Sequence, residues 1–111
     1  MSKTMKAIIK PEQAPGLAMA EVPAPKIGPH EALIKVRATS ICGTDLHIYK
    51  WDEWARKRIR PPLVVGHEFC GHVAAVGRDV TEVKEGDFVS AESHITCGHC
   101  AQCRTGNGHI C

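Results

Sequence analysis

Apolar and polar positions alternate over short stretches in the first third of the chain, and prolines and glycines separate these stretches. Residues 34–38 read Ile-Lys-Val-Arg-Ala, which has the two-residue period of a half-buried β-strand. This pattern predicts a strand over residues 31–39. Two shorter strands are predicted over 7–10 and 17–22, because the flanking turn residues leave room for little more.

The middle of the chain has a different pattern. Residues 44–60 are compatible with one helix or two short helical turns, and Pro61 and Pro62 prevent any continuation. Two further strands are predicted over 69–76 and 87–93. Many short strands with little helix indicate a mostly β domain, either a small barrel or a sandwich. The sequence holds no Gly-x-Gly-x-x-Gly motif for a dinucleotide.

Length and charge narrow the possible roles. A chain of 111 residues has room for one compact domain. Its 14 basic and 12 acidic residues are intermixed, for a net charge of +2, which argues against nucleic acid or an anionic membrane as partner. No apolar run approaches the ~20 residues of a membrane span, and residues 1–10 lack the apolar core of a secretory signal. We therefore expect a cytoplasmic protein, in which six cysteines indicate metal binding or catalysis rather than disulfides.

Four cysteines near the end of the sequence have the spacing of a metal-binding loop. Four thiolates in the pattern Cys-x2-Cys-x2-Cys-x7-Cys can surround one tetrahedral zinc ion, with Zn–S distances near ~2.3 Å. The set is Cys97, Cys100, Cys103 and Cys111. We assign residues 94–111 to a structural zinc loop, with a disulfide cluster or an iron–sulfur cluster as alternatives, since spacing alone does not identify the metal.

A second, catalytic zinc site is predicted from a mixed set of ligands. Such a site needs about three protein ligands and one open position, and Cys42, His67 and Glu68 supply them. Neighbouring strand residues point to opposite faces, so His67 and Glu68 share a metal only if the backbone bends at Gly66; otherwise Glu68 lies outside the ligand set. Taken singly, Cys42 is more readily interpreted as a buried thiol and His67 as a hydrogen-bonded core histidine, so the metal site rests on the combination.

Three residues that follow Cys42 have predicted roles around this metal. Zinc lowers the proton affinity of a bound alcohol oxygen, so the proton needs an exit when hydride leaves the carbon. Thr44 and His47 are three residues apart and share a face if the segment is helical, which fits a hydroxyl-to-imidazole proton relay. Asp45 is placed to accept the free N–H of a metal-bound histidine.

The segment Gly66-His67-Glu68-Phe-Cys-Gly-His-Val-Ala-Ala-Val-Gly77 resembles the signature of the zinc-containing alcohol dehydrogenases. The stretch from Cys42 to His47 and the four-cysteine loop resemble the same family in the same order, so the similarity covers essentially the whole chain. The resemblance implies a GroES-like, partly open β-barrel with short helices. It also implies Cys42, His67 and Glu68 around a catalytic zinc, with Thr44 and His47 in proton relay.

Within that family, residues 47–54 and 92–100 are similar to the L-threonine 3-dehydrogenases. This resemblance implies NAD-linked oxidation of L-threonine to 2-amino-3-oxobutanoate, two zinc ions per subunit, a homotetramer, and a substrate-pocket role for His94. It also implies a Rossmann domain after Cys111, so we expect 1–111 to be an N-terminal catalytic fragment that is inactive alone. A polyol or secondary-alcohol dehydrogenase is one alternative, and a free-standing zinc module that binds a macromolecule is another.

Overall fold

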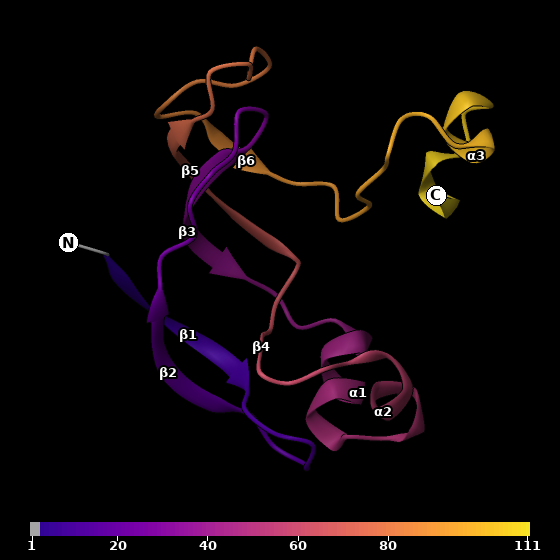
Figure 1. Ribbon diagram of the computed structural model, residues 1–111. Coiled ribbons are helices and arrows are strands. Elements are labelled where there is room, and N and C mark those ends of the chain that lie inside the picture. The colour runs from indigo at the N-terminus through magenta and orange to yellow at the C-terminus, as the bar shows by residue number, and fades with distance from the viewer. Residues whose placement is uncertain (1–2) are drawn as a thin grey trace.

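The computed structural model of the protein describes residues 3–111. Two three-stranded antiparallel sheets form its body (Figure 1). In the first sheet the central strand β1 pairs with β2 and β4, and in the second the central strand β5 pairs with β3 and β6. The strands are β1 (Thr4–Lys10), β2 (Ala18–Pro23), β3 (Ala32–Thr39), β4 (Leu63–Val64), β5 (Phe69–Val76) and β6 (Phe88–Ser90).

The two sheets do not close into a continuous barrel. Within residues 3–111 no ladder of hydrogen bonds joins one sheet to the other. A hollow of about 1070 Å³ is lined by side chains of β1, β3 and β5, among them Met5, Val36 and Phe69. The predicted fold class, mostly β with a partly open barrel, is confirmed. The expected half-burial of β3 holds for Ile34 but not for Val36, which is 56% exposed because it borders this hollow.

Two short helices lie between β3 and β4. Of the two possibilities predicted for residues 44–60, one helix or two short helical turns, the second is found. They are α1 (Gly43–Lys50) and α2 (Glu53–Arg58). α1 ends because Trp51 takes a left-handed conformation, with φ 55°, and donates its N–H to the carbonyls of His47 and Ile48. Asp52 then begins α2, since its side chain accepts the N–H of Ala55.

Three of the five buried apolar residues of the described range, 3–111, lie in this helical turn: Ile48 of α1, Trp51 directly after α1, and Ala55 of α2. The other two are Ala7 of β1 and Val73 of β5. Lys10, at the end of β1, is also buried, and its ammonium donates to the carbonyls of Ala14 and Gly16 at 2.5 and 2.6 Å. The same ammonium lies 5.2 Å from the centroid of the Trp51 ring, so this cation ties β1 to the end of α1.

The strand predictions differ from the structure mainly in length. The strand predicted over 69–76 is found with those bounds, whereas β6 covers only 88–90 of the predicted 87–93. The two-residue strand β4 was not predicted, because it is too short to show a periodic pattern. No helix in the described part of the chain is both long and apolar enough to cross a bilayer.

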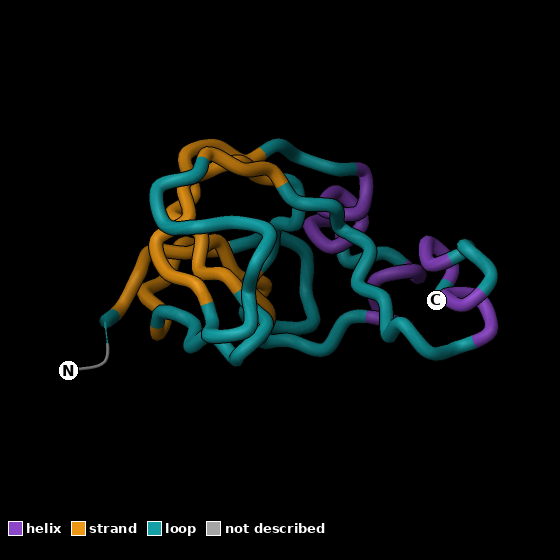
Figure 2. Tube along the Cα trace, turned by 90° about the horizontal axis from the view of Figure 1, so that it is seen from above, coloured by secondary structure: helices purple, strands orange, loops and turns teal. Residues whose placement is uncertain are grey.

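Residues 97–111 form a separate unit, which we call the cysteine lobe. It contains α3 (Ala101–Arg104) and the 3-10 helix η1 (Gly108–Ile110). In Figures 1 and 2 the lobe stands away from both sheets, at the end of an extended connection that follows β6. The lobe therefore cannot draw on the core of the barrel for its stability.

Candidate metal centres

The pairing of β3 with β5 brings together the residues predicted to bind the catalytic zinc. The two strands are antiparallel, and Thr39 at the end of β3 pairs with Phe69 at the start of β5. The chain that leaves β3 and the chain that enters β5 therefore lie at the same edge of the sheet. This register places Cys42, just before α1, beside His67 and Glu68, just before β5.

Cys42, His67 and Glu68 form a compact group of possible metal ligands. One ligand atom from each lies within 4.8 Å of the others. Gly66, directly before them, has φ 113°, a conformation that side chains disfavour. The backbone thus bends at Gly66, as expected, and His67 and Glu68 precede the regular strand rather than alternating along it. The thiol, imidazole and carboxylate of this group suit a zinc ion.

Asp45 has a buried oxygen that fits a metal-bound histidine. Its Oδ2 accepts the N–H of Cys42 at 2.9 Å, which fixes the start of α1. Its Oδ1 is the buried side-chain oxygen that lacks a hydrogen-bond partner in residues 3–111, and it lies 3.7 Å from Nδ1 of His67. This distance exceeds that of a hydrogen bond. A small rotation of His67 would close the gap and leave its Nε2 for the metal.

Glu68 is held by the end of β3. Its Oε2 accepts the hydroxyl of Ser40 at 2.7 Å, and its carbonyl oxygen accepts the hydroxyl of Thr39 at the same distance. The Ser40 hydroxyl, followed by the Cys42 thiol, lowers the pKa of Glu68. The other carboxylate oxygen, Oε1, lies 4.0 Å from Nε2 of His67. Sequence reasoning missed Ser40, since a lone serine after a strand carries no signal of such a contact.

The two residues of the predicted relay lie on α1, one turn apart. Thr44 is half-buried in the first turn, and the ring of His47 is 52% exposed. Nδ1 of His47 contacts Oδ2 of Asp52, at the start of α2. Asp52 is a second residue that sequence reasoning missed. Residues five apart do not face each other on a helix, so the spacing gave no signal. The contact forms because the chain turns at Trp51, between the two residues.

His94 lies on the extended connection between β6 and the cysteine lobe. Its Nδ1 contacts Oε1 of Glu92 at 2.5 Å, and its side chain is 56% exposed. A hollow of about 410 Å³ beside the first metal group is lined by His67, Glu68 and Ser93 but not by His94. A substrate-pocket role for His94 therefore stays a prediction.

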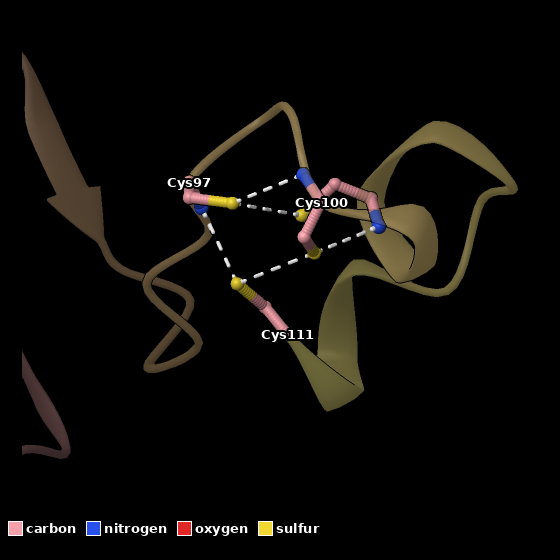
Figure 3. Close-up of side chains that lie close together, drawn as sticks. Cys97, Cys100 and Cys111 are labelled. Carbon is pink, nitrogen blue, oxygen red and sulfur yellow. Dashed lines mark hydrogen bonds between the residues drawn. The ribbon is translucent and has the colours of Figure 1, made fainter.

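The four cysteine sulfur atoms of the cysteine lobe lie within 4.8 Å of one another. Figure 3 labels three of these residues, Cys97, Cys100 and Cys111. Sγ of Cys97 lies 4.0 Å from Sγ of Cys103, and Sγ of Cys100 lies 3.9 Å from Sγ of Cys111. Four sulfur atoms at ~2.3 Å from a tetrahedral zinc ion would be about 3.8 Å apart. A disulfide would need about 2.05 Å, so the spacing fits a metal and not the disulfide alternative.

Backbone amides around these sulfur atoms favour thiolates. The N–H of Cys100 points to Sγ of Cys97 at 3.3 Å, and the N–H of Cys103 points to Sγ of Cys100 at 3.4 Å. The backbone N–H groups of His99 and Cys100 lower the pKa of Cys97 to about 6. A thiolate is the form that binds metal, so the loop is arranged to receive a cation.

Comparison with known proteins identifies the family. The family model described as the alcohol dehydrogenase GroES-like domain matches residues 28–111. The chain belongs to this family. Its GroES-like domain carries both cysteine-containing groups described above, and the match spans β3, β5 and the cysteine lobe.

Curated relatives match this chain over all of its 111 residues, and one of them serves as an example. It is the L-threonine 3-dehydrogenase of Bacillus licheniformis, 60% identical over 111 residues. The match covers 100% of this chain and 32% of the relative. The chain thus spans about a third of the length of the curated relatives it matches.

Two solved structures share the fold of this domain. The alcohol dehydrogenase TADH from Thermus sp. ATN1 superposes with a TM-score of 0.81 at 38% identity, covering 96% of this chain and 30% of that one. A short chain alcohol dehydrogenase from E. coli CFT073, complexed with cofactor NADH, also gives a TM-score of 0.81, at 35% identity over 100% of this chain and 31% of its own.

Proposed function

We propose that this chain is the zinc-binding catalytic domain of an NAD-dependent L-threonine 3-dehydrogenase. The enzyme oxidises L-threonine to 2-amino-3-oxobutanoate: the carbon that bears the hydroxyl gives a hydride to NAD⁺, and the hydroxyl proton passes to the protein. The observation that carries the proposal is the 60% identity to the Bacillus licheniformis L-threonine 3-dehydrogenase over all 111 residues. The NADH complex of the E. coli relative supports the choice of a nicotinamide cofactor.

The proposal assigns residues 1–111 to the catalytic domain, with 94–111 as its structural zinc loop. Cys42 and His67 hold a catalytic zinc ion, with Glu68 as a further ligand, and the four cysteines of the lobe hold a second zinc ion. The first ion, when bound, acts as a Lewis acid that lowers the proton affinity of an alcohol oxygen. Asp45 orients His67 through Oδ1, which has no hydrogen-bond partner among residues 3–111.

In the same proposal, Thr44 and His47 carry the substrate proton to solvent. Thr44 is half-buried close to Cys42, whereas His47 is exposed, so the proton moves outward along α1. His94 contributes to the substrate pocket, and NAD binds outside this domain, which has no dinucleotide motif. The resemblance to L-threonine 3-dehydrogenases supports a cytoplasmic homotetramer with a small-molecule substrate, and neither nucleic acid nor membrane as partner.

The substrate is tested with the complete protein that contains this chain. NADH formation is followed with L-threonine, sorbitol and 2,3-butanediol as alternative substrates. We expect the highest kcat/KM with L-threonine and loss of activity in Cys42→Ala. Cys70→Ala is the matched control, since Cys70 lies in β5 and belongs to neither group of ligands. A preference for sorbitol or butanediol would make the protein a polyol or secondary-alcohol dehydrogenase.

Metal content separates the enzyme from a zinc-binding interaction module. Elemental analysis should find two zinc ions per chain, because the structure has two separate groups of possible ligands. Cys103→Ser should retain one zinc ion and Cys70→Ser both. A single zinc ion in the unaltered chain, held by the four thiolates, would contradict the catalytic site and favour the module.

A further inference from the structure

We propose that Asp52 is a positioning residue for His47, which it holds in the tautomer that leaves Nε2 free to accept a proton. The inference rests on the proposed function, in which His47 carries the substrate proton. It adds to that function the residue that caps α2, outside the segment proposed to bind the catalytic metal. Its basis is the direct contact between Oδ2 of Asp52 and Nδ1 of His47.

The turn between α1 and α2 creates this contact. Trp51 ends α1 in a left-handed conformation, and the N–H of Asp52 points back to the carbonyl of His47 at 3.5 Å. The chain therefore reverses, and the side chain of Asp52 returns to the last turn of the helix that it has just left. A continuous helix would have placed residues five apart on different faces.

Both oxygens of Asp52 are engaged, which fixes the carboxylate. Oδ1 accepts the N–H of Ala55 at 3.1 Å as the cap of α2, and Oδ2 faces His47. The hydrogen bond from His47, followed by that from Ala55, lowers the pKa of Asp52. Asp52 is thus ionised at neutral pH, when a carboxylate only accepts hydrogen bonds. A neutral imidazole facing it must carry its proton on Nδ1, so the lone pair lies on Nε2.

Two neighbours restrict the ring and the turn. The centroid of the His47 ring lies 5.5 Å from that of Trp54, on the same helix as Asp52. Trp51 is buried, with the ammonium of Lys10 over its ring. No partner lies within hydrogen-bond distance of Nε2 of His47 in residues 3–111. The arrangement holds one ring nitrogen and leaves the other accessible, as a proton acceptor requires.

Asp52→Asn is the decisive substitution, because it should keep the helix cap of α2 and change the tautomer of His47. Asparagine caps a helix as well as aspartate does, so its oxygen should stay with the N–H of Ala55. Its amide N–H₂ then faces His47 and donates to Nδ1, which moves the proton of the ring to Nε2. The same exchange in a serine protease triad leaves the geometry intact but presents the wrong tautomer.

The tautomer is measured directly by ¹⁵N NMR of the histidine rings in this chain. Spectra are taken at pH ~8.5, about two units above the pKa of an unperturbed histidine, so that neutral rings dominate. His47→Gln assigns the His47 signals by their loss. We expect the proton on Nδ1 in the unaltered chain and on Nε2 in Asp52→Asn. A proton on Nε2 in the unaltered chain would overturn the inference, whatever the activity of the enzyme.

Kinetics on the complete protein then separate positioning from a structural role. We expect Asp52→Asn to lower kcat with L-threonine by roughly 10²-fold or more, with KM nearly unchanged. Asp52→Ser should also lower kcat, because serine caps α2 but is too short to reach His47. Normal kcat in Asp52→Asn with an inverted tautomer would overturn the inference. If the complete protein does not oxidise L-threonine at all, the proposed function fails, and the tautomer measurement still decides the role of Asp52.

Glu53→Gln is the matched control for both measurements. Glu53 is the next residue of α2, its side chain is 81% exposed, and it pairs with Lys57 away from His47. We expect an unchanged tautomer and unchanged kinetics. The urea midpoint of each variant, within error of the unaltered chain, would show that loss of activity does not come from unfolding of the helical turn.

Discussion

The barrel and the cysteine lobe are stabilised in different ways. The sheets have ladders of backbone hydrogen bonds, and the barrel has buried apolar residues such as Ala7 of β1 and Val73 of β5. In residues 91–111, by contrast, no residue is buried, and α3 has only 4 residues. Such a helix is too short to be stable alone. We therefore expect the barrel to be held by its own packing, and the lobe by the metal ion that its four cysteines are proposed to bind.

Removal of metal is the strongest way to separate the two regions. After treatment with a chelator we expect the amides of Arg104, Asn107 and Cys111 to exchange rapidly with solvent, because structural zinc typically contributes about 10–16 kcal/mol of binding free energy to a small loop. The amide of Val73, bonded to the carbonyl of Asp87 at 2.9 Å, should stay protected. Hydrogen exchange by NMR checks both. Protection of the lobe amides without metal would show that packing suffices.

Gly71→Ala should destabilise the barrel and leave the cysteine lobe unchanged. A Cβ at this position would lie 2.3 Å from the carbonyl oxygen of Lys35 on the neighbouring strand, so β3 and β5 would have to move apart. We expect a loss of about 1–3 kcal/mol in the free energy of unfolding of the barrel, from urea denaturation. The zinc affinity of the four cysteines should not change.

Gly43→Ala is the control for that experiment, because a Cβ there would meet no atom of residues 3–111 within 4 Å. A destabilisation as large as that of Gly71→Ala would mean that the loss of glycine flexibility, and not the contact with β3, is the cause. A change in zinc affinity in Gly71→Ala would show that the two regions are coupled.

The smallest expected effect is a loss of barrel stability at acidic pH. Oδ2 of Asp87 accepts the N–H of Lys84 at 2.9 Å, and this bond, followed by the interaction with the Lys84 side chain, lowers the pKa of Asp87. A lowered pKa stabilises the fold at pH values above ~3.9, the usual pKa of aspartate in an unfolded chain. This stabilisation is lost as the pH falls through the lower pKa of Asp87 in the folded protein. Asp87→Asn should thus lower the urea midpoint at pH ~7 but not near pH ~2.5. An equal difference at both pH values would contradict this origin.

The sequence predicted the elements of the barrel because their signals are local. Alternation predicted β3, and the turn-rich stretch that follows residue 76 helped to predict β5. The four-cysteine spacing predicted the lobe, since all its ligands lie within one loop. The contact between Asp52 and His47 could not be predicted, because it depends on a reversal of the chain. Asp52 reaches His47 only because Trp51 turns left-handed, and no rule of composition places a tryptophan in that conformation.

The group of Cys42, His67 and Glu68 was predicted from residue type and family resemblance, but its closeness depends on the register of β3 and β5. That register contains an irregularity between Val36 and Ala38, which no periodic pattern reveals. The open face of β3 was not predicted either. Alternation shows which side chains share a face and does not show whether another element covers that face.

Lys10 gives the molecule an internal reporter. The other seven lysines of residues 3–111 are exposed, whereas the amine of Lys10 is enclosed by two carbonyls and an aromatic ring. An acylating reagent should therefore modify every lysine except this one while the protein is folded. Mass spectrometry of Lys10 after a timed pulse would then measure how often the contacts of residues 14–16 and Trp51 with this amine open, with no probe attached to the protein.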